Sequence, residues 1–254
     1  MATQDLHMHT TWCDGKSTPE EMIISGIKKG LCKIGITAHA YTWFDESYCL
    51  KKEDYPAFKK EVRELAVKYK DKIEVLCGIE QDYYSDMTTE GFDYIIGSNH
   101  YLKADGKYYP IDSSEKQFIE LAGLFDGDYL SMCEAYFKNV GDVINKTGAD
   151  IIGHFDMITK YNERGNYIDT TEPRYIHAWK RAADELLKHH KPFEINTGAV
   201  SRGYRTSPYP SKEIFRYIVS SGGIFMANSD CHSAEYVSYG LDEWSRRLFL
   251  GEEF

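Results

Sequence analysis

Two histidines near the start of the chain, His7 and His9, stand two positions apart in the stretch Asp5-Leu6-His7-Met8-His9-Thr10. Residues two apart in an extended strand point to the same face of a sheet. Both imidazoles therefore aim at one point, and imidazole nitrogen is a common ligand of divalent metal ions. The same pair could also stand on the solvated face of an edge strand, so the rest of the chain has to distinguish a metal site from a polar surface.

Further residues of metal-binding types follow other short apolar runs. The run Ile34-Gly35-Ile36-Thr37-Ala38 leads to His39, and a later run, 92–98, leads to His100. The same pattern holds further along the chain for Glu80, His154, Asp230 and His232. Three histidines fall instead within stretches of helical patterning, and we interpret them as surface or packing residues: His177, His189 and His190.

The apolar runs alternate with amphipathic stretches of helical periodicity. Thr18 can cap a helix that has Pro19 at its first position, and Gly30 is a natural end for it. We expect strands at 3–9, 34–38, 73–79, 92–98, 150–153, 193–197 and 224–228. We expect helices at 17–30, 54–70, 173–190, 211–221 and 234–249, two more between 115 and 147, and a hairpin around Asp105-Gly106.

This alternation of strands and helices predicts an α/β fold with a parallel sheet and right-handed crossovers. No linker, repeat or low-complexity segment marks a second domain in the 254 residues, a length that suits one barrel. In a barrel the carboxyl ends of the strands converge on one face, where active sites form. The ligand candidates would then gather in a single pocket.

Composition narrows the class of protein. With 42% apolar and 28% charged residues, the chain is typical of a soluble globular protein. The formal net charge of −10 disfavours a broad surface for nucleic acid or for an anionic membrane. The absence of a secretory signal, of a membrane-spanning apolar run and of CxxC pairs predicts reduced thiols in a cytoplasmic protein. Cys13 and Cys231 are interpreted as packing residues although they stand beside ligand candidates.

The ordered set of motifs resembles the polymerase and histidinol phosphatase (PHP) superfamily. The resemblance covers nearly the whole chain and rests on His7-x-His9, His39, Glu80, His100, Gly153-His154-Phe155-Asp156 and Ser229-Asp230-Cys231-His232. It implies a distorted, TIM-like (β/α)7 barrel that forms a single domain over residues 1–254. It also implies a cluster of up to three divalent metal ions, and the ligand types suit zinc, manganese or iron equally well.

The same resemblance implies how the ligands divide among the metals. They are His7, His9, Glu80 and Asp230 for the first metal, Glu80, His100 and His154 for the second, and Asp14, His39 and His232 for the third. One position departs from the pattern. The residue before the second-strand histidine is often acidic in the superfamily, and here it is Ala38. The change could remove a partner that orients His39 and weaken the third site, or it could be harmless.

Clustered divalent ions suit the hydrolysis of phosphate monoesters, which is very slow without a catalyst. The hypothesis is that a metal-bridging hydroxide attacks phosphorus while the third metal polarises the phosphoryl group. Either a metal-bound water or Asp156 would protonate the leaving group. Lys160 and Arg202, in loops after the fifth and sixth strands, are candidates for binding the phosphate. Arg164 and Arg205 are interpreted as solvated loop charges.

Within the superfamily, Glu194-Ile195-Asn196-Thr197 and Pro208-Tyr209-Pro210-Ser211 most resemble the histidinol-phosphate phosphatases. This implies a small-molecule phosphate ester, L-histidinol phosphate, as the substrate. Its cationic amine would require an acidic or aromatic neighbour, for which the candidates are Asp45, Glu46 and Asp82. The aromatic residues after His39 either line this pocket or pack the loop, and they are Tyr41, Trp43 and Phe44.

Other functions remain open at this point. A phosphoesterase for another substrate, such as a nucleotide or a phosphotyrosine, would share the same metal chemistry. A metal-binding regulatory module without catalysis is favoured only by Ala38. Hydrolysis of carbon–nitrogen bonds would usually need a differently arranged ligand set. The sequence predicts no particular oligomeric state.

Overall fold

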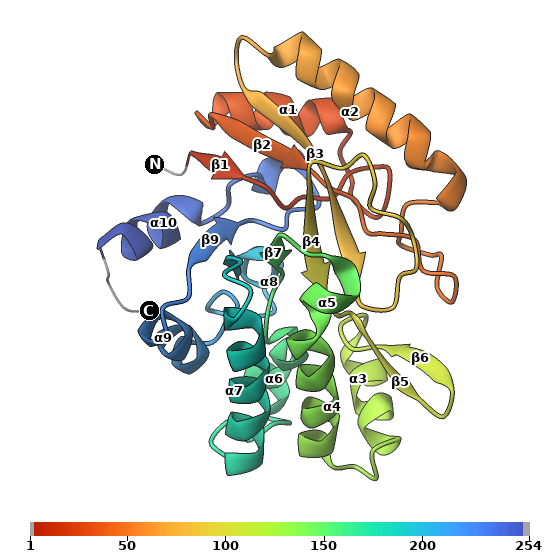
Figure 1. The fold of residues 1–254 in the computed structure, drawn as a ribbon, viewed down its shortest axis with the longest axis vertical. Helices are drawn as coiled ribbons and strands as arrows, with labels where there is room; N and C mark the ends of the chain where they lie inside the picture. The colour runs from red at the N-terminus through yellow and green to blue at the C-terminus, as the bar shows by residue number, and fades with distance from the viewer. Residues whose placement is uncertain (1–2, 251–254) are drawn as a thin grey trace.

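The computed structural model describes residues 3–250 and centres on one parallel sheet of seven strands. The strands follow the order β1-β2-β3-β4-β7-β8-β9, and each pairs in parallel with its neighbours (Figure 1). Their bounds are β1 Gln4–Asp5, β2 Lys33–Ile36, β3 Glu74–Asp82, β4 Tyr94–Ser98, β7 Ile151–Ile152, β8 Phe193–Asn196 and β9 Phe225–Asn228. A separate antiparallel hairpin consists of β5 Tyr101–Ala104 and β6 Lys107–Pro110.

The two edges of this sheet meet, so the sheet is nearly closed. Met8 and Cys231 form a parallel bridge, and the backbone N–H of His9 donates to the Cys231 carbonyl at 2.8 Å. The backbone N–H of Leu6 donates to Oδ1 of Asn228 at 2.9 Å. Contacts between single residues replace a regular ladder here, as expected of a distorted barrel. The predicted (β/α)7 architecture is therefore confirmed.

Helices surround the barrel, and their bounds are α1 Pro19–Lys28, α2 Tyr55–Tyr69, α3 Glu115–Gly123, α4 Tyr129–Gly141, α5 Val143–Thr147, α6 Asn162–Gly165, α7 Pro173–Leu187, α8 Gly198–Ser201, α9 Lys212–Ser220 and α10 Leu241–Leu250. Figure 1 shows α1 and α2 on the side of β2 and β3, with α4 and α7 side by side at the opposite end. The first helix begins as predicted, because Thr18 and Glu21 form a capping box ahead of Pro19. None of the helices within residues 3–250 combines the length and apolar character needed to cross a membrane.

Several expectations differ from the structure. The first strand covers only Gln4–Asp5 of the expected 3–9, and three helices, α3, α4 and α5, occupy residues 115–147 where two were expected. The third strand was expected to end at residue 79, but β3 continues to Asp82, so that Glu80 belongs to the strand itself. The expected helix 234–249 is broken, because Ser238 and Gly240 have φ of 60° and 70°, which no α-helix accommodates. A 3-10 turn over Ala234–Tyr236 and the later helix α10 replace it. Short helices α6 and α8 also stand where only loops were expected.

The barrel interior is filled in part by one tyrosine. Tyr94 of β4 packs with Leu6 and Ile96, and its hydroxyl donates to the Leu6 carbonyl at 2.5 Å. Glycines on the two preceding strands leave room for its ring. A Cβ on Gly35 would lie 2.0 Å from the Tyr94 hydroxyl, and one on Gly78 would lie 2.3 Å from Cζ of the same ring. The two glycines are therefore explained by packing rather than by backbone conformation.

Gly78→Ala should lower the free energy of unfolding by at least about 2 kcal/mol, because the new methyl group overlaps the Tyr94 ring in a packed interior. Guanidinium denaturation at a fixed metal concentration measures the change. Gly123→Ala is the control, since nothing lies within 4 Å of a Cβ at that position, and it should be neutral or slightly stabilising. Equal stability of Gly78→Ala and the wild type would show that Tyr94 does not occupy this space.

Candidate metal centre

Five histidines surround the carboxylate of Glu80, which β3 delivers to the carboxyl end of the barrel. Its Oε1 lies 2.9 Å from Nε2 of His154 and 3.2 Å from Nε2 of His100. Its Oε2 lies 2.8 Å from Nδ1 of His39 and 3.3 Å from Nε2 of both His7 and His9. Glu80 is 1% exposed. Burial raises the pKa of its carboxyl, but His100, His7 and His39 together hold that pKa well below its ordinary value.

Asp230 provides a second carboxylate near the same two histidines, His7 and His9. Its Oδ1 lies 3.7 Å from Nε2 of His7 and 3.4 Å from Nε2 of His9. The residue follows β9 and has a φ of 48°, an uncommon conformation for a residue with a side chain. Arg202 fixes it there, since Nη1 donates to the Asp230 carbonyl at 2.8 Å and Nη2 lies 3.2 Å from Oδ2.

Asp14 provides a third carboxylate, which lies near His39 and His232. Its Oδ1 lies 3.6 Å from Nε2 of His39, and its Oδ2 lies 3.3 Å from Nε2 of His232. A tight turn positions Asp14. The backbone N–H of Gly15 donates to the Thr10 carbonyl, and a Cβ at Gly15 would overlap the backbone of His9. Burial raises the pKa of the Asp14 carboxyl, but the charge of His39 and a hydrogen bond to His232 lower it to well below the usual range.

The spacing of these atoms fits divalent metal ions. Separations of 3.3–3.7 Å from the Nε2 atoms of His7 and His9 to the carboxylates are long for hydrogen bonds. Two ligands that are each about 2.1 Å from one tetrahedral ion lie about 3.4 Å apart. Nε2 of His7, Nε2 of His9 and Oε2 of Glu80 are buried without a hydrogen-bond partner. Such orphaned donors and acceptors are costly unless a further ligand satisfies them.

The side chains form three groups, and within each group the ligand atoms lie within 4.8 Å of one another. These groups contain eight of the nine predicted ligands, and the ninth, His154, lies 2.9 Å from Glu80. All nine candidates therefore lie close together, but His9 and His39 each belong to two groups, whereas the predicted division shares only Glu80. The groups are His7, His9 and Asp230; His39, Glu80 and His100; and His9, Asp14, His39 and His232.

A second layer of carboxylates orients the histidines. Oε1 of Glu194 accepts a hydrogen bond from Nδ1 of His7 at 2.7 Å, and Oε2 accepts from the backbone N–H of His154 at 3.0 Å. Oδ2 of Asp82 lies 3.2 Å from Nδ1 of His100. The thiol of Cys13 lies 3.4 Å from Nδ1 of His9. Partners on the far ring nitrogen fix which nitrogen faces the metal.

Glu194 is the residue whose positioning role the sequence prediction missed. It is fully buried in β8, and Asn196 and Asn228 also donate to its oxygens, at 2.9 and 3.0 Å. Burial raises the pKa of the Glu194 carboxyl, but His7 lowers it to below its ordinary value. The available signal was a single acidic residue inside an apolar strand, since a buried charge requires a partner.

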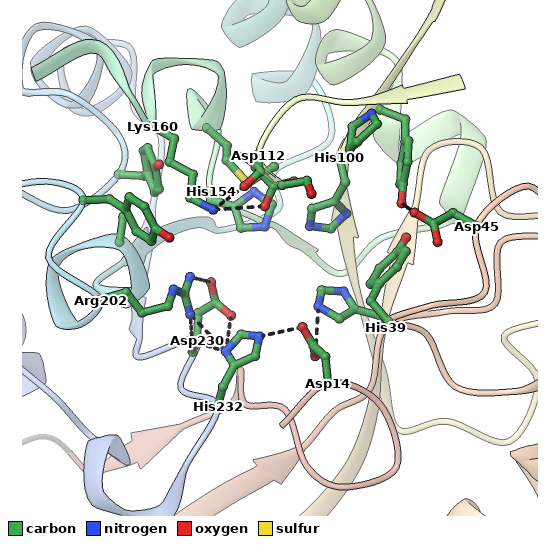
Figure 2. Close-up of a pocket in the computed structure, with 18 of the residues that line it drawn as sticks. Asp14, His39, Asp45, His100, Asp112, His154, Lys160, Arg202, Asp230 and His232 are labelled. Carbon is green, nitrogen blue, oxygen red and sulfur yellow. Dashed lines mark hydrogen bonds and ion pairs between the residues drawn. The ribbon is translucent and has the colours of Figure 1, made fainter. Parts of the chain in front are cut away.

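Six of the ligand candidates line a pocket of about 320 Å³ (Figure 2), and they are Asp14, His39, His100, His154, Asp230 and His232. Arg202 and Lys160 stand on one wall, as predicted from their loops. Arg202 also contacts the ligands, since its Nη1 lies 2.9 Å from Nδ1 of His232. Nζ of Lys160 donates to the Asp112 carbonyl at 2.6 Å and lies 3.4 Å from Oδ2 of the same residue. Asp112 lines the pocket and was not singled out from the sequence.

Asp156 lies apart from this pocket. It is 0% exposed, is not among the residues that line the cavity, and its Oδ2 accepts a hydrogen bond from the backbone N–H of Ser211 at 3.0 Å. Arg205 is buried over the ring of Tyr209, at 4.5 Å from its centroid, so it is a structural residue rather than a solvated charge. Arg164 is exposed and donates to the Gly203 carbonyl, as expected of a loop charge.

Ala38 does not disturb the position of His39. Its side chain is fully buried in an apolar cluster with Met8 and Ile36, whereas the imidazole of His39 faces Glu80 and Asp14. Neighbouring residues in extended backbone point to opposite faces. Partners other than residue 38 therefore orient His39.

A nearly closed parallel (β/α)7 barrel, with histidines and carboxylates gathered at the carboxyl ends of its strands, defines a metal-dependent hydrolase by its architecture and donor set. The particular family follows from comparison with known proteins. The chain belongs to the PHP domain family, whose model matches residues 5–198.

Similar proteins include the "Probable histidinol-phosphatase" of Deinococcus radiodurans, which is 27% identical over 92% of this chain and 88% of its own length. The histidinol-phosphatase of Bacillus subtilis is 22% identical over 97% of this chain and all of its own length. Among solved structures, the histidinol phosphate phosphatase of Lactococcus lactis in complex with zinc, L-histidinol and phosphate matches with a TM-score of 0.76. It shares 20% identity over 99% of this chain and 94% of the other. Together with the ligand groups, these findings support a metal-dependent phosphoesterase.

Glu194→Gln should weaken zinc binding by about 10- to 100-fold, because an amide cannot accept from His7, His154, Asn196 and Asn228 at once. Competition with a chromophoric chelator at neutral pH measures the affinity. The control is Glu185→Gln, an exposed residue of α7 that pairs with Lys188 and should bind zinc as the wild type does. An unaltered zinc affinity in Glu194→Gln would refute the positioning role.

Proposed function

We propose that the chain is a phosphomonoesterase that hydrolyses L-histidinol phosphate to L-histidinol and phosphate at a site for up to three divalent metal ions. The observation that carries the proposal is the convergence of five histidines on Glu80, beside a pocket that contains Arg202. The names of the relatives support the substrate, as does the ligand pair in the Lactococcus lactis structure.

The residues proposed to hold the ions are divided as the resemblance to the superfamily implies. They are His7, His9, Glu80 and Asp230 for the first, Glu80, His100 and His154 for the second, and Asp14, His39 and His232 for the third. Zinc, manganese or iron bound there would neutralise phosphoryl oxygens and make a water molecule more acidic. The donor set does not select one of these metals.

Arg202 binds and orients the phosphoryl group in this proposal. Its guanidinium carries five N–H donors, and the contacts with Asp230 and His232 engage only part of them. Those contacts fix the plane of the guanidinium, and Arg202 lines the pocket, so its remaining donors are available to a phosphate bound there. A preorganised fork of this kind is well suited to two phosphate oxygens.

Lys160 contributes positive charge to the same wall but is not a free ammonium group. Its Nζ lies 4.7 Å from the centroid of the Tyr204 ring and donates a hydrogen bond to the Asp112 carbonyl. Lys160 therefore holds the loop after β6 against the pocket. Asp156 is proposed to fix the start of α9 through Ser211 rather than to donate a proton, because it lacks access to the pocket.

We also propose that residues 1–254 form one domain, although the family model ends at 198. The later segment supplies β9, which pairs with β8, and it brings Asp230 and His232 to the site. Without these elements the barrel would lack a strand and the site would lack two ligands.

Phosphate release from L-histidinol phosphate, compared with a panel of nucleotides, sugar phosphates and phosphotyrosine, tests the function. After loading with zinc or manganese, the wild type should prefer L-histidinol phosphate by at least tenfold in kcat/KM. His9→Ala should lose most of this activity, because it removes a ligand shared by two groups. His189→Ala, at a residue without a contact to the site, is the matched control.

Each outcome of this panel has a definite meaning. Turnover of several phosphate esters without a preference would retain the phosphoesterase and exclude the named substrate. Metal binding without any turnover would favour the regulatory module and contradict the proposal.

A further inference from the structure

The wall of the pocket that faces Arg202 comes from a different part of the chain. The loop between β2 and α2 provides Asp45 and Tyr48, and the start of β5 provides Tyr101. Figure 2 shows Asp45 on the side of His39, across the pocket from Arg202. This loop is fixed to the hairpin, because Phe44 stacks on Tyr108 with ring centroids 4.0 Å apart.

Asp45 is held as an ionised acceptor on this wall. Its Oδ1 accepts from the backbone N–H and the hydroxyl of Ser47, at 3.0 and 2.6 Å, and its Oδ2 accepts from the Tyr101 hydroxyl at 2.8 Å. Burial raises the pKa of this carboxyl, but these hydrogen bonds lower it to below its ordinary value. In the part of the chain that the structure describes, no ion pair joins Asp45 to a lysine or arginine.

The other carboxylates near the pocket already have cationic or metal-binding partners. Asp112 pairs with Lys160, whereas Asp14 and Asp230 belong to the metal-binding groups. Glu46 accepts from the Tyr41 hydroxyl and lies 3.7 Å from Lys51, and Asp82 faces His100 from behind. Of the three acids considered from the sequence, Asp45 is the one that lines the pocket.

The position of Asp45 matches the far end of a substrate whose phosphate lies at the metal centre. The ring of Tyr48 lies near both, since its centroid is 4.9 Å from that of the ligand candidate His39 and 6.1 Å from that of Tyr101, whose hydroxyl donates to Asp45. A carboxylate beside aromatic rings is a favourable environment for an organic cation. A leaving group that extends along these rings could therefore bring a positive charge to Asp45.

We propose that Asp45, with Tyr48 and Tyr101, forms a cation subsite that binds a protonated nitrogen of the leaving group and makes the enzyme selective for phosphate esters of amino alcohols. This inference rests on the proposed function and names the residues that determine its specificity. Nucleotides and sugar phosphates present no such cation, so they gain nothing from this wall.

Asp45→Asn tests the subsite, because the amide keeps the shape of the side chain and removes its charge. The substrates are L-histidinol phosphate, which carries an ammonium group, and phenyl phosphate, which carries none, both at pH 8 with saturating zinc. We expect kcat/KM for L-histidinol phosphate to fall by about tenfold or more, mainly through KM, with a much smaller change for phenyl phosphate. Glu46→Gln is the matched control, since this neighbouring acid does not line the pocket, and it should keep the wild-type selectivity.

A second readout does not require the enzyme to hydrolyse L-histidinol phosphate. L-Histidinol should inhibit the hydrolysis of phenyl phosphate by the wild type, and Asp45→Asn should raise its inhibition constant by about tenfold. Equal losses for both substrates in Asp45→Asn, or no loss for either, would overturn the subsite. A wild type that hydrolyses phenyl phosphate but not L-histidinol phosphate would overturn the proposed function, and the inhibition constants would still decide the role of Asp45.

Discussion

The buried carboxylate of Glu80 imposes the constraint on which the rest of the site depends. An ionised carboxylate inside a protein costs several kcal/mol unless charges and hydrogen bonds compensate it. Here the imidazoles of His7, His9 and His39 converge on one oxygen and those of His100 and His154 on the other. Because these groups come from different strand ends, their compensation of Glu80 depends on the closed barrel. Divalent ions bound among the same atoms would supply this positive charge instead, since imidazoles bind metal ions in their neutral form.

Further buried polar residues hold the ligand candidates in place through hydrogen bonds. Glu194 accepts hydrogen bonds from the ring of His7 and from the backbone N–H of His154. One side chain therefore connects two ligand candidates that come from different strands. Arg202 performs a related function for Asp230 and His232, since it contacts both. The pocket therefore combines candidate metal ligands with a basic wall at Arg202 and an acidic wall at Asp45. This distribution of charge suits a substrate that is anionic at one end and cationic at the other.

Much of this arrangement could be predicted from the sequence, because period-two patterning and chain order determine where strands deliver their last residues. The barrel and the convergence of eight ligand candidates follow from that logic, whereas Asp14, which lies in a loop, was expected only from the resemblance to the PHP superfamily. The pairing of Lys160 with Asp112 could not be foreseen, since it joins a loop after β7 to a loop after the hairpin. The buried position of Asp156 was equally hidden, because a motif next to His154 does not reveal which way each side chain points. Sequence distance carries no information on such contacts.

A zinc titration of the metal-free protein shows whether Glu80 organises the site, when bound zinc and phosphate release from L-histidinol phosphate are followed together for the wild type and for Glu80→Gln. Wild-type activity should appear only as more than one equivalent of zinc binds, and Glu80→Gln should bind fewer equivalents and lose activity. Circular dichroism confirms that the variant remains folded. Full activity in the metal-free wild type, or unchanged zinc binding and activity in Glu80→Gln, would contradict the claim that this carboxylate organises the site.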